Sequence, residues 1–333
     1  MLAATRSLAY RLVDRSMKFA DIAVNLTDPQ FEGTYHGRQK HSSDLEAVVS
    51  RAKGKGVERI LITGTSLEES RRALDLARRF DLHSTAGCHP TSTSEIDSYP
   101  GGTERYLADL RRLIAEDRGE GGSKRVISVG EIGLDYDRLH HSPRETQLKH
   151  LPALLAMAKE FQLPIFLHSR TSESHGDLVA ALKGAGWGDR GAGWKGGVVH
   201  SFTGTKAEVQ ELVDMGLHVG VNGCSLKTEE NLEAVKTIPL DRLLLETDSP
   251  WCSCTSTQAS HAHLPPPDSP LHIPKVSKPQ GWKPDHGVKG RMEPAEIGLI
   301  AHVVARTRGM AMEELAAAVW ANTMRLFYPQ EKK

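Results

Sequence analysis

Short apolar segments recur along the chain, and most are followed by a stretch with helical spacing. Each apolar segment ends in small or polar residues, as strands of a buried parallel sheet do. The segments span residues 19–26, 59–64, 83–88, 125–133, 164–168, 197–200, 217–223 and 242–248. The stretches between them, such as SLEESRRALDLARRF and RETQLKHLPALLAMAKEF, place apolar residues on one helical face with charges opposite. A strand followed by a helix, repeated about eight times, predicts a single-domain α/β fold, the (β/α)8 TIM barrel.

A doubly wound open sheet has the same alternation, so the number of segments alone fits both architectures. Polar residues gather at the ends of the apolar segments, which favours the barrel, because the chemistry of a TIM barrel lies at the C-terminal ends of its strands.

Residues 184–197 are Gly-rich and are expected to form a flexible loop, and residues 253–290, rich in Pro, Ser and His, are expected to form a longer one. Amphipathic helices over 293–308 and 312–327 are expected to close the barrel.

The composition adds three limits on function. The 333 residues are 39% hydrophobic, which is enough for a large core, and 42 basic residues balance 42 acidic ones. Nucleic-acid binding therefore needs a local basic patch. No apolar run approaches the roughly 20 residues of a membrane helix. The four cysteines are too few and too unevenly placed for a secreted disulfide framework, so we expect a reducing compartment, the cytoplasm or nucleus.

The first sixteen residues carry Arg6, Arg11 and Arg15 against Asp14 alone. This pattern resembles a mitochondrial transit peptide, and the alternative is a disordered extension before Met17. The expected organisation is an N-terminal extension over 1–16 and one barrel domain over 17–330.

Four residues with ligand-type side chains end four of the apolar segments. They are Glu131, His168, His200 and Asp248. On a barrel they would meet at one rim, where two imidazoles and two carboxylates suit a divalent cation. A single histidine of this kind is more often structural, but four such residues at equivalent positions favour a metal site.

Several motifs resemble those of the TatD-like metal-dependent deoxyribonucleases. They are EIGLDY (131–136), LHSR (167–170), VHSFTG (199–204), ETDSPW (246–251), KGRMEP (289–294), ADIAVNLTD near the start and GCHP (87–90). They occur in the family's order and span residues 17–327. The resemblance implies an amidohydrolase-like TIM barrel with DNase activity, including 3′ to 5′ exonuclease action, and a role in DNA repair or degradation.

The resemblance also implies roles for the four residues. Glu131 would bridge two metal positions, His168 and His200 would hold one metal, and Asp248 would belong to the other and act as the base for the attacking water. The expected cofactor is one or two divalent cations, with Mg²⁺ first for activity and Mn²⁺ or Zn²⁺ as alternatives. The expected partner is DNA, with no membrane and no obligate protein partner.

The sequence departs from the family at two places. Many members carry an Asp-x-His-x-His motif, but here Asp21 is followed by Ala23 and Asn25. The loss of two nitrogen ligands should weaken one metal position and favour Mg²⁺, since Asn offers only a carbonyl oxygen. Met292 replaces the usual Asn before Glu-Pro, which leaves Pro294 as a first-turn residue.

Further residues are candidates for substrate contacts at the same rim. His89, Arg170 and Lys206 could bind phosphates, against the alternatives of a turn histidine and solvated charges. Trp251 could stack on a base, but packing beneath its loop is the favoured interpretation. Two residues are expected to orient the Glu131 loop: Asp135 and Tyr136. A separate zinc site is a minor hypothesis for the C-x-C and H-x-H pairs, Cys252, Cys254, His261 and His263.

Two other functions compete with the nuclease. A small-molecule hydrolase for an amide, lactone or phosphotriester fits the same metal rim and the neutral net charge, but the predicted ligands lack the carbamylated lysine of its usual binuclear form. A non-catalytic barrel could bind partners through residues 253–290. The presence of all four ligand-type residues argues against it.

Overall fold

The computed structural model describes residues 17–188, 193–273 and 275–330. Within them, eight parallel strands form one sheet in the order β1-β4-β5-β6-β7-β8-β9-β10. These are β1 (Phe19–Val24), β4 (Val57–Ile62), β5 (His83–Ala86), β6 (Val126–Asp135), β7 (Ile165–Arg170), β8 (Gly197–Val199), β9 (His218–Val221) and β10 (Leu243–Leu245). Each predicted apolar segment supplies one strand. Because only neighbours along the chain pair with each other, the order is that of a barrel.

The sheet closes between its first and last strands. Val24 and Ser249 form a parallel bridge. The Asn25 amide donates to the Ser249 carbonyl at 2.8 Å, and the Asp248 amide donates to the Ala23 carbonyl at 2.9 Å. This closure excludes the doubly wound open sheet and confirms the predicted barrel.

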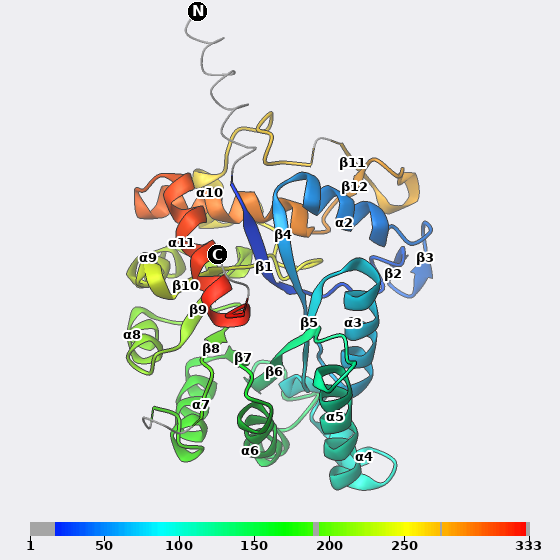
Figure 1. Ribbon diagram of the computed structural model, residues 1–333. Coiled ribbons are helices and arrows are strands. Elements are labelled where there is room, and N and C mark those ends of the chain that lie inside the picture. The colour runs from blue at the N-terminus through cyan, green and yellow to red at the C-terminus, as the bar shows by residue number, and fades with distance from the viewer. Residues whose placement is uncertain (1–16, 189–192, 274, 331–333) are drawn as a thin grey trace, which may run out of the picture.

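Helices surround the ring of strands (Figure 1). They are α2 (Leu45–Gly54), α3 (Leu67–Phe80), α4 (Ser94–Ser98), α5 (Gly102–Arg118), α6 (Arg144–Phe161), α7 (Ser172–Gly184), α8 (Lys206–Asp214), α9 (Glu229–Thr237), α10 (Ile297–Arg308) and α11 (Met312–Phe327). Local sequence sets where several of them begin. At α8, for example, the Thr205 hydroxyl accepts from the Glu208 amide while the Glu208 carboxylate accepts from the Thr205 amide. The predicted helices over 293–308 and 312–327 correspond to α10 and α11.

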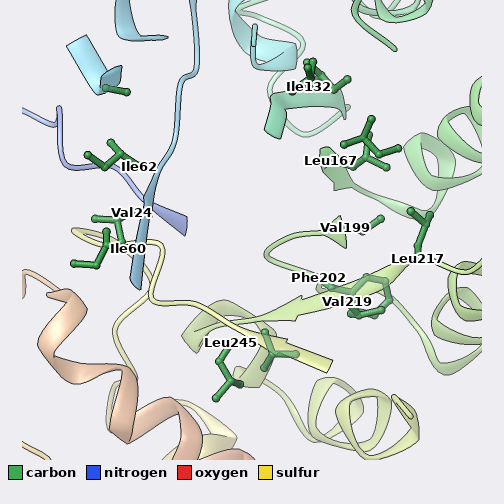
Figure 2. Packing of buried hydrophobic residues seen from close by; sticks show 14 of the residues in the cluster. Val24, Ile60, Ile62, Ile132, Leu167, Val199, Phe202, Leu217, Val219 and Leu245 are labelled. Atoms are coloured by element: carbon green, nitrogen blue, oxygen red, sulfur yellow. The ribbon is translucent and has the colours of Figure 1, made fainter. Parts of the chain in front are cut away.

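Apolar side chains pack on both sides of the barrel wall. The outer cluster joins the strands to the helices, and Figure 2 shows part of it, including Ile62 of β4, Leu167 of β7 and Leu245 of β10. The inner cluster includes Ile22, Leu61, Ile127, Phe166, Val198 and Leu244 from six strands, with Leu326, Phe327 and Tyr328 from the end of the chain. Because both faces of the strands are buried, each strand reads as a nearly continuous apolar run.

The long loop after β10 contains short elements that the sequence pattern did not predict. They are η4 (Ala259–His263), β11 (Val276–Ser277), η5 (Pro279–Gly281) and β12 (Gly287–Val288). Its C-terminal end is held by the buried Arg291, whose guanidinium donates to both oxygens of Asp44, at 2.9 and 2.6 Å, and to Glu293 at 2.8 Å. Pro294 begins η6 (Pro294–Glu296), as predicted. The Gly-rich loop over 184–197 lies partly outside the described residues.

The remaining short elements are β2 (Thr34–Tyr35), β3 (Arg38–Gln39), η1 (Pro90–Ser92), η2 (Gly223–Leu226) and η3 (Leu240–Arg242). No helix among the described residues is both long and apolar enough to cross a membrane. Residues 1–16, for which a targeting function was predicted, lie outside the described part of the chain.

Replacing His218 with Gln is expected to weaken the acid dependence of the free energy of unfolding. Burial and then Arg242 lower the pKa of His218 to about 4 from an ordinary value of 6.5. The unfolded chain takes up this proton below pH 6.5, whereas the folded protein takes it up only near pH 4. Wild-type stability is therefore lost as pH falls through this window, by up to about 3 kcal/mol.

Urea unfolding between pH 7 and pH 4 measures this dependence. The matched control replaces the exposed His140 with Gln and should keep the wild-type slope. A His218→Gln protein that loses stability with acid as steeply as the wild type would show that His218 does not carry the effect.

Candidate metal centre

Two glycines in β6 place Glu131 inside the barrel. The pairing of β6 with β7 shifts register between Val129 and Ile132, so the strand bulges at Glu131. Gly133 has φ +142°, and a Cβ there would lie 2.0 Å from the His168 carbonyl oxygen. Only glycine allows this approach of the two backbones. The sequence VGEIG thus fixes Glu131 beside His168.

The four predicted ligands lie at the C-terminal ends of their strands and line one cavity of about 770 Å³. Glu131 lies within β6 and His168 within β7, while His200 directly follows β8 and Asp248 follows β10. All four are buried or nearly so. Residues that are far apart in the sequence are therefore brought to one rim.

One carboxylate oxygen is the centre of the cluster. Glu131 Oε1 lies 2.6 Å from His200 Nε2, 2.8 Å from His168 Nδ1 and 3.3 Å from His89 Nε2. The nitrogens of His168 and His200 are themselves 3.3 Å apart. Three imidazole nitrogens crowd an oxygen that has two lone pairs. Ligand atoms converge in this way around a shared cation, so these residues fit a divalent metal ion.

A second carboxylate lies behind each of two imidazoles. Asp135 Oδ2 lies 3.3 Å from His168 Nε2, and Glu246 Oε1 lies 3.4 Å from His200 Nδ1. Neither contact has the geometry of a hydrogen bond. A carboxylate at the distal nitrogen is the usual arrangement for a metal-binding histidine. Asp135 was expected to orient the Glu131 loop; its Oδ1 accepts from the Asp137 amide at 3.0 Å, and its Oδ2 faces His168.

Glu246 is fully buried and rigidly held. Its Oε1 accepts from the Ser201 amide at 2.7 Å and from Asn222 Nδ2 at 2.9 Å, while its Oε2 has no hydrogen-bond partner. Glu246 was not among the site residues predicted from the sequence. The available signal was a carboxylate that directly follows the buried strand and precedes Thr247 and Asp248.

Asn25 holds Asp248 rather than offering a free oxygen. Its Nδ2 donates to Asp248 Oδ1 at 2.8 Å, and its Oδ1 accepts from the Thr63 hydroxyl at 2.6 Å. The side-chain carbonyl expected to face a metal is therefore engaged by Thr63. The other oxygen of Asp248 accepts from the Cys252 thiol at 3.3 Å.

Asp21 holds the segment that carries Asp248, through hydrogen bonds with Thr247. It accepts from the Thr247 amide at 2.9 Å and from the Thr247 hydroxyl at 2.6 Å. Burial raises the pKa of Asp21 to about 8, against the lowering effect of these hydrogen bonds. Asp21 does not line the cavity. It ties β1 to the residues after β10.

The charges in the cluster depend on each other. Burial opposes ionisation of Glu131, but the charge of His200, the neighbouring His89 and hydrogen bonds from His168 and His200 outweigh burial and lower the pKa of Glu131 well below its usual range. Burial likewise opposes charge on His200, but Glu131 and Glu246 raise its pKa well above the usual value. Burial raises the pKa of Asp248. Within the described residues, the ion pairs of Glu131 and Glu246 involve imidazoles alone. A cation would neutralise this buried negative charge.

Two groups of side chains have ligand atoms that all lie within 4.8 Å of one another. One contains Glu131, His168 and His200, and the other contains His89, Asp135 and His168. Asp248 shares the cavity but belongs to neither group.

Only some of the candidates for substrate contacts line the cavity. His89 and Arg170 line the cavity. Lys206 does not, and its ammonium pairs with Glu233 at 3.0 Å on the surface. Trp251 also lines the cavity and is 53% exposed, so the favoured packing beneath the loop is wrong. Tyr136 points elsewhere and donates to Asp177 at 2.6 Å.

Other residues that line the cavity were missed. Arg138 and Lys227 follow β6 and β9 in loops, where no periodic pattern marks them, and Cys224 lies beside Cys252. The hypothetical zinc ligands Cys252, Cys254, His261 and His263 form no group with metal-ligand distances among the described residues.

The barrel and its rim of imidazoles and carboxylates define the class of amidohydrolase-like hydrolases. A solved structure of an uncharacterized amidohydrolase from Saccharomyces cerevisiae superposes with a TM-score of 0.83 at 30% identity, over 94% of this chain and 100% of that one. A hydrolase TatD family protein from Entamoeba histolytica superposes with a TM-score of 0.84 at 33% identity, over 94% and 99% of the chains.

Sequence comparisons give the family. The model of the protein family described as "TatD related DNase" matches residues 20–328. A deoxyribonuclease Tat-D from Schizosaccharomyces pombe is 41% identical over 94% of this chain and 96% of that protein. A 3′-5′ ssDNA/RNA exonuclease TatD from Erwinia amylovora is 36% identical over 92% and 98% of the chains. The chain belongs to the TatD-related DNase family, which confirms the resemblance found in its motifs.

Replacing Glu246 with Gln is expected to weaken Mn²⁺ binding by about 10- to 100-fold, the usual effect of losing a carboxylate behind a metal-binding histidine. Isothermal titration calorimetry of metal-stripped protein measures the affinity, and circular dichroism checks the fold. Glu230→Gln, at an exposed carboxylate, should bind Mn²⁺ as the wild type does. Equal affinities for all three proteins would contradict the positioning role of Glu246.

Proposed function

We propose that this chain is a metal-dependent deoxyribonuclease that hydrolyses phosphodiester bonds and trims DNA from its 3′ end. The observation that carries the proposal is the convergence of Glu131, His168, His200 and Asp248 on one cavity in a member of this family. The names of the relatives, deoxyribonuclease and 3′-5′ ssDNA/RNA exonuclease, support the substrate and the polarity. The proposed catalytic unit is residues 17–330.

In the proposed site, Glu131, His168 and His200 would hold a divalent cation, and Asp248 would act from the wall of the same cavity. A bound divalent cation, Mg²⁺ in the first instance, neutralises phosphate charge and activates water. Glu131 fixes both imidazoles through its Oε1 contacts. Asp135 and Glu246 lie behind the two rings and keep them oriented.

Asp248 accepts the proton of the attacking water in this proposal. Asn25 occupies Oδ1 and fixes the plane of the carboxylate, so the proton would pass to Oδ2. Burial raises the pKa of Asp248, which makes it a better base than a solvated carboxylate. Before the water binds, the Cys252 thiol holds Oδ2 in position, and rotation of the thiol then frees this oxygen for the proton.

The rim of the cavity carries features suited to a single strand of nucleic acid. Arg138, Arg170 and Lys227 line it and make no ion pair with a carboxylate in the described parts of the chain. Cations that have no carboxylate partner bind phosphates. Trp251 exposes half of its surface at the same rim, as aromatic residues that stack on bases do. This local patch meets the requirement set by the neutral net charge.

The enzyme would act in the cytoplasm or nucleus, or in the mitochondrion if residues 1–16 direct import.

Replacing Asp248 with Ala or with Asn is expected to lower the rate of DNA hydrolysis by at least about 100-fold, because the proton acceptor is lost. Metal-stripped enzyme is incubated with single-stranded DNA labelled at the 3′ or the 5′ end, after addition of Mg²⁺, Mn²⁺ or Zn²⁺. Early release of the 3′ label as mononucleotides reports the polarity. Asp214→Asn, at an exposed carboxylate of α8, is the matched control.

Full activity of either Asp248 variant would overturn its assigned role. An RNA strand and a panel of lactones and phosphotriesters are assayed beside the DNA. Hydrolysis of the panel without hydrolysis of either nucleic acid would overturn the nuclease in favour of a small-molecule hydrolase.

Removing a rim cation is expected to raise KM more than it lowers kcat. For Arg170→Ala and Lys227→Ala, the slope of log affinity against log salt should fall by about 0.7 per charge removed. Fluorescence anisotropy of labelled single-stranded DNA in Ca²⁺ measures this slope. Lys206→Ala is the control, since Lys206 pairs with Glu233 away from the cavity. If Lys206→Ala alone changed the slope, the path of the strand would be elsewhere.

A further inference from the structure

Two cysteines from neighbouring loops meet at the wall of the cavity. Cys224 lies in η2, directly after β9, and Cys252 lies in the segment that follows β10. Their sulfurs are 2.6 Å apart, and both residues are partly buried and line the cavity. A small oxidant that enters the cavity can therefore reach both thiols.

The backbone holds this pair together. A Cβ at Gly223 would lie 1.9 Å from the Cys252 carbonyl oxygen, so the two loops pack backbone against backbone at this point. The Cys224 amide donates to Asn222 Oδ1 at 2.8 Å, which fixes the turn after β9. Bond formation closes the sulfur separation from 2.6 Å to about 2.05 Å.

The other cysteines lack this arrangement. Cys88 is fully buried in the core. Cys254 contacts no other sulfur within the described residues, although it is only two residues from Cys252. The neighbouring Cys252 thiol lowers the pKa of Cys224, burial opposes this effect, and the charge of Lys227 adds to the lowering, so the thiolate form of Cys224 is favoured. Thiolates are the reactive form of cysteine.

We propose that Cys224 and Cys252 are a modification site for hydroperoxides, at which a reversible disulfide forms and switches off the nuclease. The regulatory part rests on the proposed function, whereas disulfide formation does not. In a reducing compartment both thiols stay free, and a disulfide that forms in an exposed cavity is of the labile, regulatory kind.

The chemistry balances with the peroxide as the oxidant. The Cys224 thiolate attacks a peroxide oxygen, the O–O bond breaks, and the sulfur becomes a sulfenic acid while the other oxygen leaves as an alcohol or water. Cys252 then attacks the Cys224 sulfur and releases water. Overall, two thiols lose two electrons and two protons, and the peroxide gains them. A thiol reductant reverses the change.

The disulfide acts on Asp248. In the reduced protein each oxygen of Asp248 accepts a hydrogen bond, Oδ1 from Asn25 and Oδ2 from the Cys252 thiol. Oxidation removes the thiol proton and draws the Cys252 sulfur toward Cys224. The carboxylate then loses one of its two side-chain supports. A loss of activity of about tenfold is expected, the lower end for removing such a support from a metal-site carboxylate.

The test compares the wild type with Cys224→Ser, Cys252→Ser and Cys254→Ser before and after treatment with hydrogen peroxide. The wild type and Cys254→Ser should each lose two free thiols and become lighter by about 2 Da, as two hydrogens leave. Peptide mapping without reductant should show Cys224 linked to Cys252. Their activity should fall and return with dithiothreitol. Cys224→Ser and Cys252→Ser should form no internal bond and keep their own untreated activity.

Three results would overturn the proposal. One is the absence of a Cys224–Cys252 bond in the mapped peptides, and another is equal, reversible inhibition of Cys224→Ser. The third is bound zinc that shields both thiols from iodoacetamide, which would indicate a thiolate metal site. If the reduced protein proves inactive on DNA, the proposed function fails separately. Disulfide formation is then still judged by mass, and its effect on Asp248 by comparing Mn²⁺ affinities of the oxidised and reduced protein.

Discussion

The closure of the barrel between β10 and β1 is the constraint on which the site depends, because the residues that close it surround Asp248. The Asp248 amide donates to the Ala23 carbonyl, and the Asn25 amide donates to the Ser249 carbonyl. Asp21 binds the backbone and hydroxyl of Thr247 on the same side. These contacts join the first and last strands and leave the Asp248 carboxylate little freedom. One set of hydrogen bonds therefore both closes the barrel and holds the candidate catalytic residue, Asp248.

A second constraint is electrostatic. Glu131 and Asp248 line one cavity, and Asp135 and Glu246 lie behind two of its imidazoles, so four carboxylates are gathered where burial is costly and like charges repel. The imidazole of His200 neutralises part of this charge, and Glu131 in turn favours its protonated form. A rigid barrel can hold such an arrangement, since each side chain comes from the end of a different buried strand. The same arrangement leaves the centre ready for a cation.

Glycine decides how closely these strand ends approach. Gly133 allows β6 to approach the His168 carbonyl, and Gly223 allows the loop after β9 to approach Cys252. In the first case the result is a bulge that turns Glu131 inward. In the second it is a pair of thiols, of which Cys252 contacts Asp248. Both features combine a candidate chemical group with a backbone contact that a side chain would prevent.

The sequence by itself determined the eight strands and the family. Eight apolar runs that end in polar residues gave the eight strands, and the motifs from EIGLDY to KGRMEP gave the TatD-related DNase family, because strand period and motif order are local properties of the chain. It also named Glu131, His168, His200 and Asp248, since position at a strand end predicts position at the rim.

Only the tertiary structure decided which side chains face one another. It directed the Asn25 carbonyl to Thr63, placed Glu246 behind His200, and brought Cys224 to Cys252. It put Lys227 at the rim and left Lys206 on the surface with Glu233. These partners come from loops far apart in the chain. Their contacts depend on the register and closure of the barrel, which no local pattern encodes.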